Sequence, residues 1–165
     1  MRQIIPTPAA RRSAETPSLR TIVSDVVDDL QRQAADSGRP LPRFSLDVSA
    51  GHRLPADVSA LRQIVEQSLR AAVRVTAASA TMARTAEVVV TSVEYPDRLE
   101  LEIADSGPSV SEREADGGPF VGRPQVVGQS LLDRLAATVR LDDCPEGGVA
   151  RTFVMPLSAT RRVAA

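Results

Sequence analysis

Residues 99–108 read Leu-Glu-Leu-Glu-Ile-Ala-Asp-Ser-Gly-Pro. Apolar and polar side chains alternate along the first five of these residues, which is typical of a strand with one buried face. The strand is followed by the carboxylate of Asp105 and by Gly107, in a run of residues that favours a tight turn. The pattern therefore predicts a strand that runs into a carboxylate and a glycine turn.

A second informative segment lies upstream, at residues 61–76. Apolar residues recur there at helical spacing, and charged residues fall on the opposite side, so the segment predicts an amphipathic helix. Asp57 is well placed to cap this helix. The apolar stripe contains Leu61, Ile64, Val65, Ser68, Ala72 and Val75, and the charged side contains Arg62, Glu66, Arg70 and Arg74.

The other segments complete an α/β pattern. Thr16 and Pro17 predict the start of a first helix, whose apolar spacing continues to Ala34 and which ends within residues 36–40. Residues 127–139 predict a third helix, and loops are expected at 77–85 and 106–126. Further strands are expected at residues 44–48, 87–93, 140–142 and 149–156, with turns at 95–98 and 145–148. This order predicts a two-layer α/β sandwich, a mixed sheet with three helices on one face.

Length and composition indicate one domain without a strong charge. The 165 residues suffice for one hydrophobic core, which we expect at residues 17–157, between a flexible arm (1–16) and a C-terminal tail (158–165). The 20 basic and 21 acidic side chains nearly cancel, which argues against binding to nucleic acid or membranes. One cysteine, Cys144, cannot form an internal disulfide, and no signal peptide is evident. We therefore expect a cytoplasmic protein.

Together these strings resemble the ATPase domain of histidine kinases, a member of the GHKL family. Residues 61–76 are similar to the N-box helix, 105–108 to the first glycine box, 118–120 to the end of the phenylalanine box, 128–131 to a Gly-Leu-Gly-Leu box, and 147–153 to the final glycine turn and its strand. The resemblance covers residues 17–157. It implies a nucleotide site that contains Asp105, Gly107, Gln67, Ala71, Gly128 and Thr152.

The departures from the family cluster at the residues that the chemistry would need. The family uses an N-box Asn to hold Mg²⁺, but this chain has no Asn, and Ala71 at that position has no oxygen for a hard cation. Ser109 replaces a glycine of the lid, and Ser130 replaces a glycine of the phosphate cradle. Arg151 stands near the position at which the family has a Thr that supports adenine, although Thr152 is one residue away. The resemblance therefore implies weak binding of ATP or ADP at most, with no Mg²⁺ required.

Two further features bear on partners. The single histidine, His52, lies in an expected loop without co-ligands, so we expect it to be neither a phosphoacceptor nor a metal ligand. The helix arginines Arg62, Arg70 and Arg74 are candidates for a docking surface. The resemblance implies a protein partner such as a response regulator, a sigma factor or a kinase-like protein.

The sequence therefore favours a degenerate histidine-kinase-like domain that acts as a regulatory or binding module in bacterial two-component-type signalling, with little or no kinase activity. Two alternatives stay open. One is an active Mg-ATP-dependent kinase or ATPase domain of the sensor-kinase or anti-sigma type. The other is a nucleotide-independent phosphotransfer or adaptor domain. Binding of Mg²⁺-ATP would discriminate among them.

Overall fold

The computed structural model describes residues 16–79, 86–115, 127–145 and 147–157, so nearly all of the predicted arm and the whole predicted tail lie outside the described residues. No helix within these ranges is long and apolar enough to cross a membrane. In chain order the elements are α1 (Leu19–Ser37), β1 (Arg43–Asp47), α2 (Val58–Ser79), β2 (Glu87–Glu94), β3 (Arg98–Asp105), α3 (Val110–Ala115), α4 (Gln129–Arg134), β4 (Thr138–Asp143) and β5 (Val149–Pro156).

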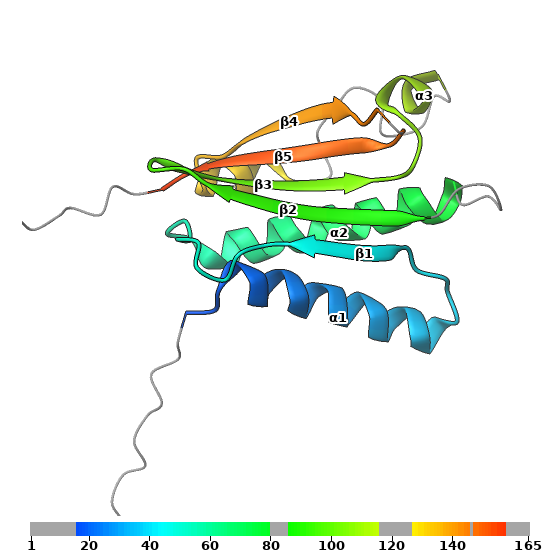
Figure 1. Cartoon of the computed structure of the whole chain (residues 1–165), viewed down its shortest axis with the longest axis horizontal. Coiled ribbons are helices and arrows are strands. Elements are labelled where there is room, and N and C mark those ends of the chain that lie inside the picture. Colours follow the sequence, from blue (N-terminus) through cyan, green and yellow to red (C-terminus); the bar gives the residue numbers. More distant parts are fainter. Residues whose placement is uncertain (1–15, 80–85, 116–126, 146, 158–165) are drawn as a thin grey trace, which may run out of the picture.

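The strands form one five-stranded sheet in the order β1-β2-β3-β5-β4. β1 pairs parallel with β2, and the other neighbours pair antiparallel, so the sheet is mixed as predicted. Helix α2 packs against α1, α4 and the central strands, and Figure 1 shows α1 and α2 running alongside the sheet. One core of buried apolar side chains joins these helices to the sheet. The predicted two-layer α/β sandwich is confirmed.

Helix α1 is held by its apolar face, which the periodicity identified correctly. Its first turn differs from the prediction, because Ser18 rather than Thr16 is the N-cap: the Ser18 hydroxyl accepts the Thr21 N–H at 3.1 Å. The helix ends at Gly38, whose φ of 63° is the left-handed conformation that glycine adopts without strain. The buried residues of α1 are Leu19, Ile22, Val23, Val26, Val27, Leu30 and Ala34.

Helix α2 begins after Asp57, as predicted. The Asp57 carboxylate accepts the Ala60 N–H at 2.9 Å, and Arg134 of α4 donates to its other oxygen at 2.9 Å. The Ala60 hydrogen bond, followed by those from Ser59 and Arg134, lowers the pKa of Asp57 to about 2. The helix continues to Ser79, so the prediction of a loop from residue 77 was wrong there, because alanine-rich segments favour helix.

The hairpin of β2 and β3 brings the quoted stretch into the core. Its turn is closed by the Tyr95 N–H, which donates to the Arg98 carbonyl at 2.8 Å, and both strands are slightly longer than predicted. Alternate residues of β3 are buried, and Asp105 is the last of them. The strand therefore ends with a carboxylate on the buried face of the sheet.

A short helix, α3, replaces part of the loop predicted at 106–126. It is started by a capping box: the Glu112 N–H donates to the Ser109 hydroxyl at 3.3 Å, and the Ser109 N–H donates to the Glu112 carboxylate at 2.7 Å. The Val110 N–H donates to the Asp143 carboxylate at 2.6 Å, which ties α3 to the end of β4. The rest of that predicted loop, at 116–126, lies outside the described residues.

The predicted helix at 127–139 was too long, because α4 ends at Arg134 and β4 begins at Thr138. The Ala136 N–H donates to the Asp133 carbonyl at 3.0 Å, and the Ala137 N–H donates to the Leu132 carbonyl at 2.8 Å. These two bonds form a Schellman motif, which requires a left-handed residue that is usually glycine. Ala136 takes that position, with φ of 47°. The sequence therefore carries no glycine to mark the end of α4.

Candidate functional site

The site that the resemblance implies is centred on Asp105. In the antiparallel pairing of β3 with β5, Ile103 lies opposite Arg151, so Arg151 projects from the same face of the sheet as Asp105. The Arg151 Nη1 atom donates to the Asp105 Oδ2 atom at 3.2 Å. The side chain of Asp105 is 0% exposed and that of Arg151 is 7% exposed. The two side chains form a buried ion pair.

The second carboxylate oxygen of Asp105 is also engaged. Its Oδ1 atom accepts the backbone N–H of Gly107 at 3.0 Å, a local turn of the kind that Asp favours. Both oxygens of the carboxylate therefore accept hydrogen bonds from the protein itself. A ligand that donates to Asp105 would have to compete with these donors and to reach an atom that is enclosed.

Gly148 packs directly against Asp105. It immediately precedes β5, in the predicted glycine turn, with φ of 98°. A Cβ atom at this position would lie 1.7 Å from the Asp105 carbonyl oxygen, which is far inside van der Waals contact. Only glycine allows the turn between β4 and β5 to approach the end of β3 so closely.

The two N-box positions of α2 differ sharply in exposure. Gln67 is exposed, whereas Ala71 is 1% exposed and presents only a methyl group. Among the described residues no group of His, Cys, Asp and Glu side chains could hold a metal ion. Ala71 therefore offers no oxygen ligand to a Mg²⁺ ion at this position of α2.

Two other predicted nucleotide residues, Thr152 and Gly128, lie on β5 and at the start of α4. Thr152 projects from the opposite face of the sheet, where its hydroxyl donates to the Glu102 carboxylate at 3.1 Å. Gly128 is the exposed N-cap residue of α4 and has no side chain to offer. The structure thus brings together Asp105, Gly107 and Arg151. It does not bring Thr152 to them.

The same architecture occurs in solved histidine kinases. The catalytic domain of histidine kinase ThkA has a TM-score of 0.64 at 16% identity, covering 88% of this chain and 96% of that chain. The mycobacterial sensor histidine kinase MprB has a TM-score of 0.60 at 21% identity, covering 84% and 94%. Acinetobacter baumannii histidine kinase AdeS has 0.64 at 15% identity, covering 87% and 67%. This chain has the histidine-kinase catalytic fold. No family profile and no curated protein sequence matches it.

Within this histidine-kinase fold, the three arginines proposed as a docking surface differ in their pairing. Arg62 donates to Asp25 of α1 at 3.3 Å, and Arg70 lies 2.9 Å from Glu66 on its own helix. Arg74 is exposed and makes no ion pair among the described residues. The three side chains therefore do not form one uniform cationic surface, because Arg62 serves the contact between α1 and α2.

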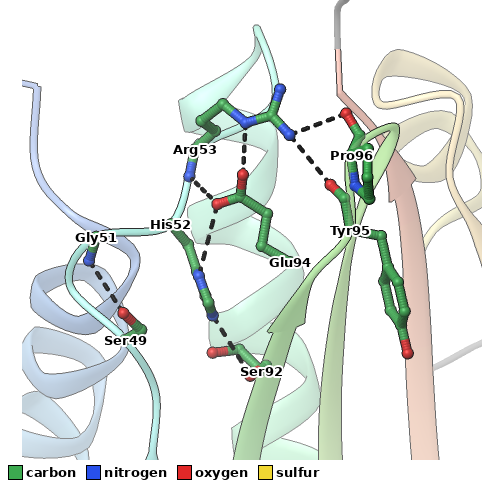
Figure 2. Close-up of polar contacts among 8 residues, drawn as sticks. All are labelled: Ser49, Gly51, His52, Arg53, Ser92, Glu94, Tyr95 and Pro96. Atoms are coloured by element: carbon green, nitrogen blue, oxygen red, sulfur yellow. Dashed lines mark hydrogen bonds and ion pairs between the residues drawn. The ribbon is translucent and has the colours of Figure 1, made fainter.

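A polar cluster around Glu94 joins the loop before α2 to the β2–β3 hairpin (Figure 2). Arg53 donates to Glu94 through its backbone N–H at 2.8 Å and its Nε atom at 2.5 Å, and its Nη2 atom reaches the carbonyls of residues 95 and 96. His52 lies between the Glu94 carboxylate, 3.6 Å from Nδ1, and the Ser92 carbonyl, 3.4 Å from Nε2. The Arg53 hydrogen bonds lower the pKa of Glu94. The sequence did not indicate this cluster, because its partners lie about forty residues apart.

Proposed function

We propose that this chain is a regulatory binding module of two-component-type signalling, with little or no kinase activity. In this proposal the nucleotide pocket of the histidine-kinase fold is closed by the protein's own side chains. The observation that carries the proposal is the buried ion pair of Asp105 and Arg151.

The pair opposes nucleotide binding by direct competition. The family resemblance implies that the Asp105 carboxylate accepts the amino group of adenine, but the Arg151 guanidinium already donates to it. Displacing the guanidinium would break this buried ion pair, and removing one partner of such a pair costs about 3–5 kcal/mol in typical proteins. A nucleotide would have to supply this free energy before it gained any affinity.

The metal position supports the absence of phosphoryl transfer. That reaction depends on a metal ion and positioned donors to neutralise the charge that develops on the phosphate. Ala71 supplies no oxygen ligand, and the chain has no Asn that could coordinate the metal ion in its place. Mg²⁺ is therefore not expected to be a cofactor, and ATP or ADP would bind weakly if at all.

If the domain neither binds nucleotide tightly nor transfers phosphate, its function in this proposal is to bind a protein partner. The structure of histidine kinase ThkA in complex with response regulator TrrA has a TM-score of 0.63 at 16% identity to this chain. This likeness supports a response regulator as the first candidate, ahead of a sigma factor or a kinase-like protein. Both partners would then meet in the cytoplasm.

Calorimetric titration with ATP and with ADP, each with and without Mg²⁺, tests the proposal. We expect no binding, or weak binding that is equal for the two nucleotides and unchanged by Mg²⁺, and no label transfer from radioactive ATP. Arg151→Thr should tighten binding by at least about tenfold, because it releases the Asp105 carboxylate. Arg140→Thr on β4 is the matched control, since the Arg140 side chain is 64% exposed.

Other results would favour the alternatives. Mg²⁺-dependent binding or phosphate transfer by the wild-type protein would support an active kinase and contradict the closed pocket. If folded Arg151→Thr protein binds no better than wild type, Arg151 is not what closes the pocket, and a nucleotide-independent adaptor becomes the better description.

A further inference from the structure

The seam between α1 and α2 opens into a groove toward the C-terminal ends of the two helices. Each helix lines it with four residues at the spacing i, i+3, i+4 and i+7, starting from Leu30 on α1 and from Arg70 on α2. Ala34 and Val73 contribute to its apolar floor, and residues 39–41 complete the lining. The cavity volume is about 520 Å³. Among the described residues, the groove therefore follows the two helices for about two turns.

The opposite half of the same seam is closed and charge-matched. There Arg62 of α2 reaches across to α1, where it donates to Asp25 at 3.3 Å and lies 4.0 Å from Asp29. The cavity next to these residues is only about 60 Å³. In this half, an acidic side chain of one helix faces an arginine of the other, beside buried apolar residues.

Like the closed half of the seam, the groove is lined by arginines, but it lacks the acidic residues that pair with them there. Arg39 and Arg74 line it together with Arg70, and no Asp or Glu is among its lining residues. Opposite α2, helix α1 offers the neutral residues Gln33 and Ser37. Neither Arg39 nor Arg74 makes an ion pair among the described residues. Cations near helix C-termini do offset the helix dipole, but this effect does not account for the apolar lining between them, where Leu41 and Val73 are partly exposed.

We propose that this groove binds an acidic amphipathic helix of a protein partner. The apolar face of that helix would cover Leu41 and Val73, and its flanking Asp or Glu residues would pair with Arg39 and Arg74. The bound helix would thus supply the acids that α1 supplies in the closed half of the seam. The lining spans eight positions on each helix, about 10 Å along the axis, which matches two turns of a ligand helix.

This inference rests on the proposed role as a binding module, but it does not depend on the nucleotide pocket. The test is selection of a displayed library of helix-forming peptides, with randomised surface positions, on the folded protein. We expect the enriched peptides to carry apolar residues at i and i+3 or i+4, flanked by Asp or Glu. A labelled, enriched peptide should bind more weakly as salt rises, and Arg74→Glu should weaken it by at least about tenfold.

Arg20→Glu is the matched control, because it makes the same charge change at an exposed residue of α1 about 15 Å along the helix from Leu30. Binding should be unchanged in that variant. Enriched peptides without acidic residues, or equal binding by the Arg74→Glu protein, would overturn the proposal. So would binding to vesicles of phosphatidylcholine and phosphatidylglycerol that Arg74→Glu abolishes, which would assign the groove to a lipid surface. Nucleotide titration of the same variants reports separately on the pocket at Asp105.

Discussion

Among individual residues, Asp105 and Arg151 each depend on the other's charge. Replacing Asp105 by Ala should lower the free energy of unfolding by about 3–5 kcal/mol, because it breaks a buried ion pair by removing one partner. Arg151→Met should also lower the free energy of unfolding, because the buried Asp105 carboxylate loses this ion-pair partner. The double variant should lose clearly less than the sum of the two single losses. Urea denaturation of the four proteins measures this coupling, and strictly additive losses would contradict it.

Gly148 should tolerate no side chain. Gly148→Ala would place a Cβ atom 1.7 Å from the Asp105 carbonyl oxygen in a left-handed backbone, so we expect a loss of about 3 kcal/mol or more in unfolding free energy. Gly38→Ala is the control, since Gly38 also has a positive φ but no atom lies within 4 Å of the position that a Cβ atom would take there. That variant should lose only about 1–2 kcal/mol. Equal losses would show that contact with Asp105 is unimportant.

Among the helices, α2 should show a pH-dependent contribution to stability through its cap. The pKa of Asp57 is lowered from 3.8 to about 2 in the folded protein. Its ionised carboxylate therefore stabilises the fold above about pH 3.8, and this stabilisation is lost as the pH falls toward 2. Between about pH 4 and pH 2, the unfolding free energy of Asp57→Asn should fall less steeply than that of wild type, while the Asn side chain still caps α2. Asp28→Asn, at an exposed position of α1, is the matched control for the change from carboxylate to amide.

The end of α4 offers a stabilising substitution. Ala136 has φ of 47°, which costs an L-residue about 1–2 kcal/mol. Ala136→Gly should raise the unfolding free energy by about 0.5–1 kcal/mol, since part of the relief is lost to the greater entropy of glycine in the unfolded chain. Ala35→Gly in α1 should have the opposite sign and cost about 1 kcal/mol. A destabilised Ala136→Gly protein in thermal or chemical denaturation would contradict the assigned helix end.

For the domain as a whole, periodicity and turn chemistry were enough to predict the layers, the sheet strands and the cap at Asp57. Those features depend on residues close together in the chain. The capping box of Ser109 and Glu112 was also visible in the sequence, but the surrounding glycines and prolines led to a loop prediction. The end of α4 could not be predicted from the sequence, because Ala136 occupies the left-handed position after the helix, where glycine is the usual residue.

The candidate site was harder to predict than the fold, because its decisive contact is not local. Asp105 was identified from the strand and turn that precede Gly107. Its partner Arg151 lies 46 residues further along, and only the register of β3 against β5 places the two on one face. The same register sends Thr152 to the other face. A shift of one residue in that pairing would exchange the two roles.

The burial of Asp105 beside Arg151 also limits how these two positions could change during evolution. A first change at either position would break a buried ion pair, so it would be opposed through stability alone. The two positions are therefore expected to change together, or only after another substitution has raised the stability of the fold.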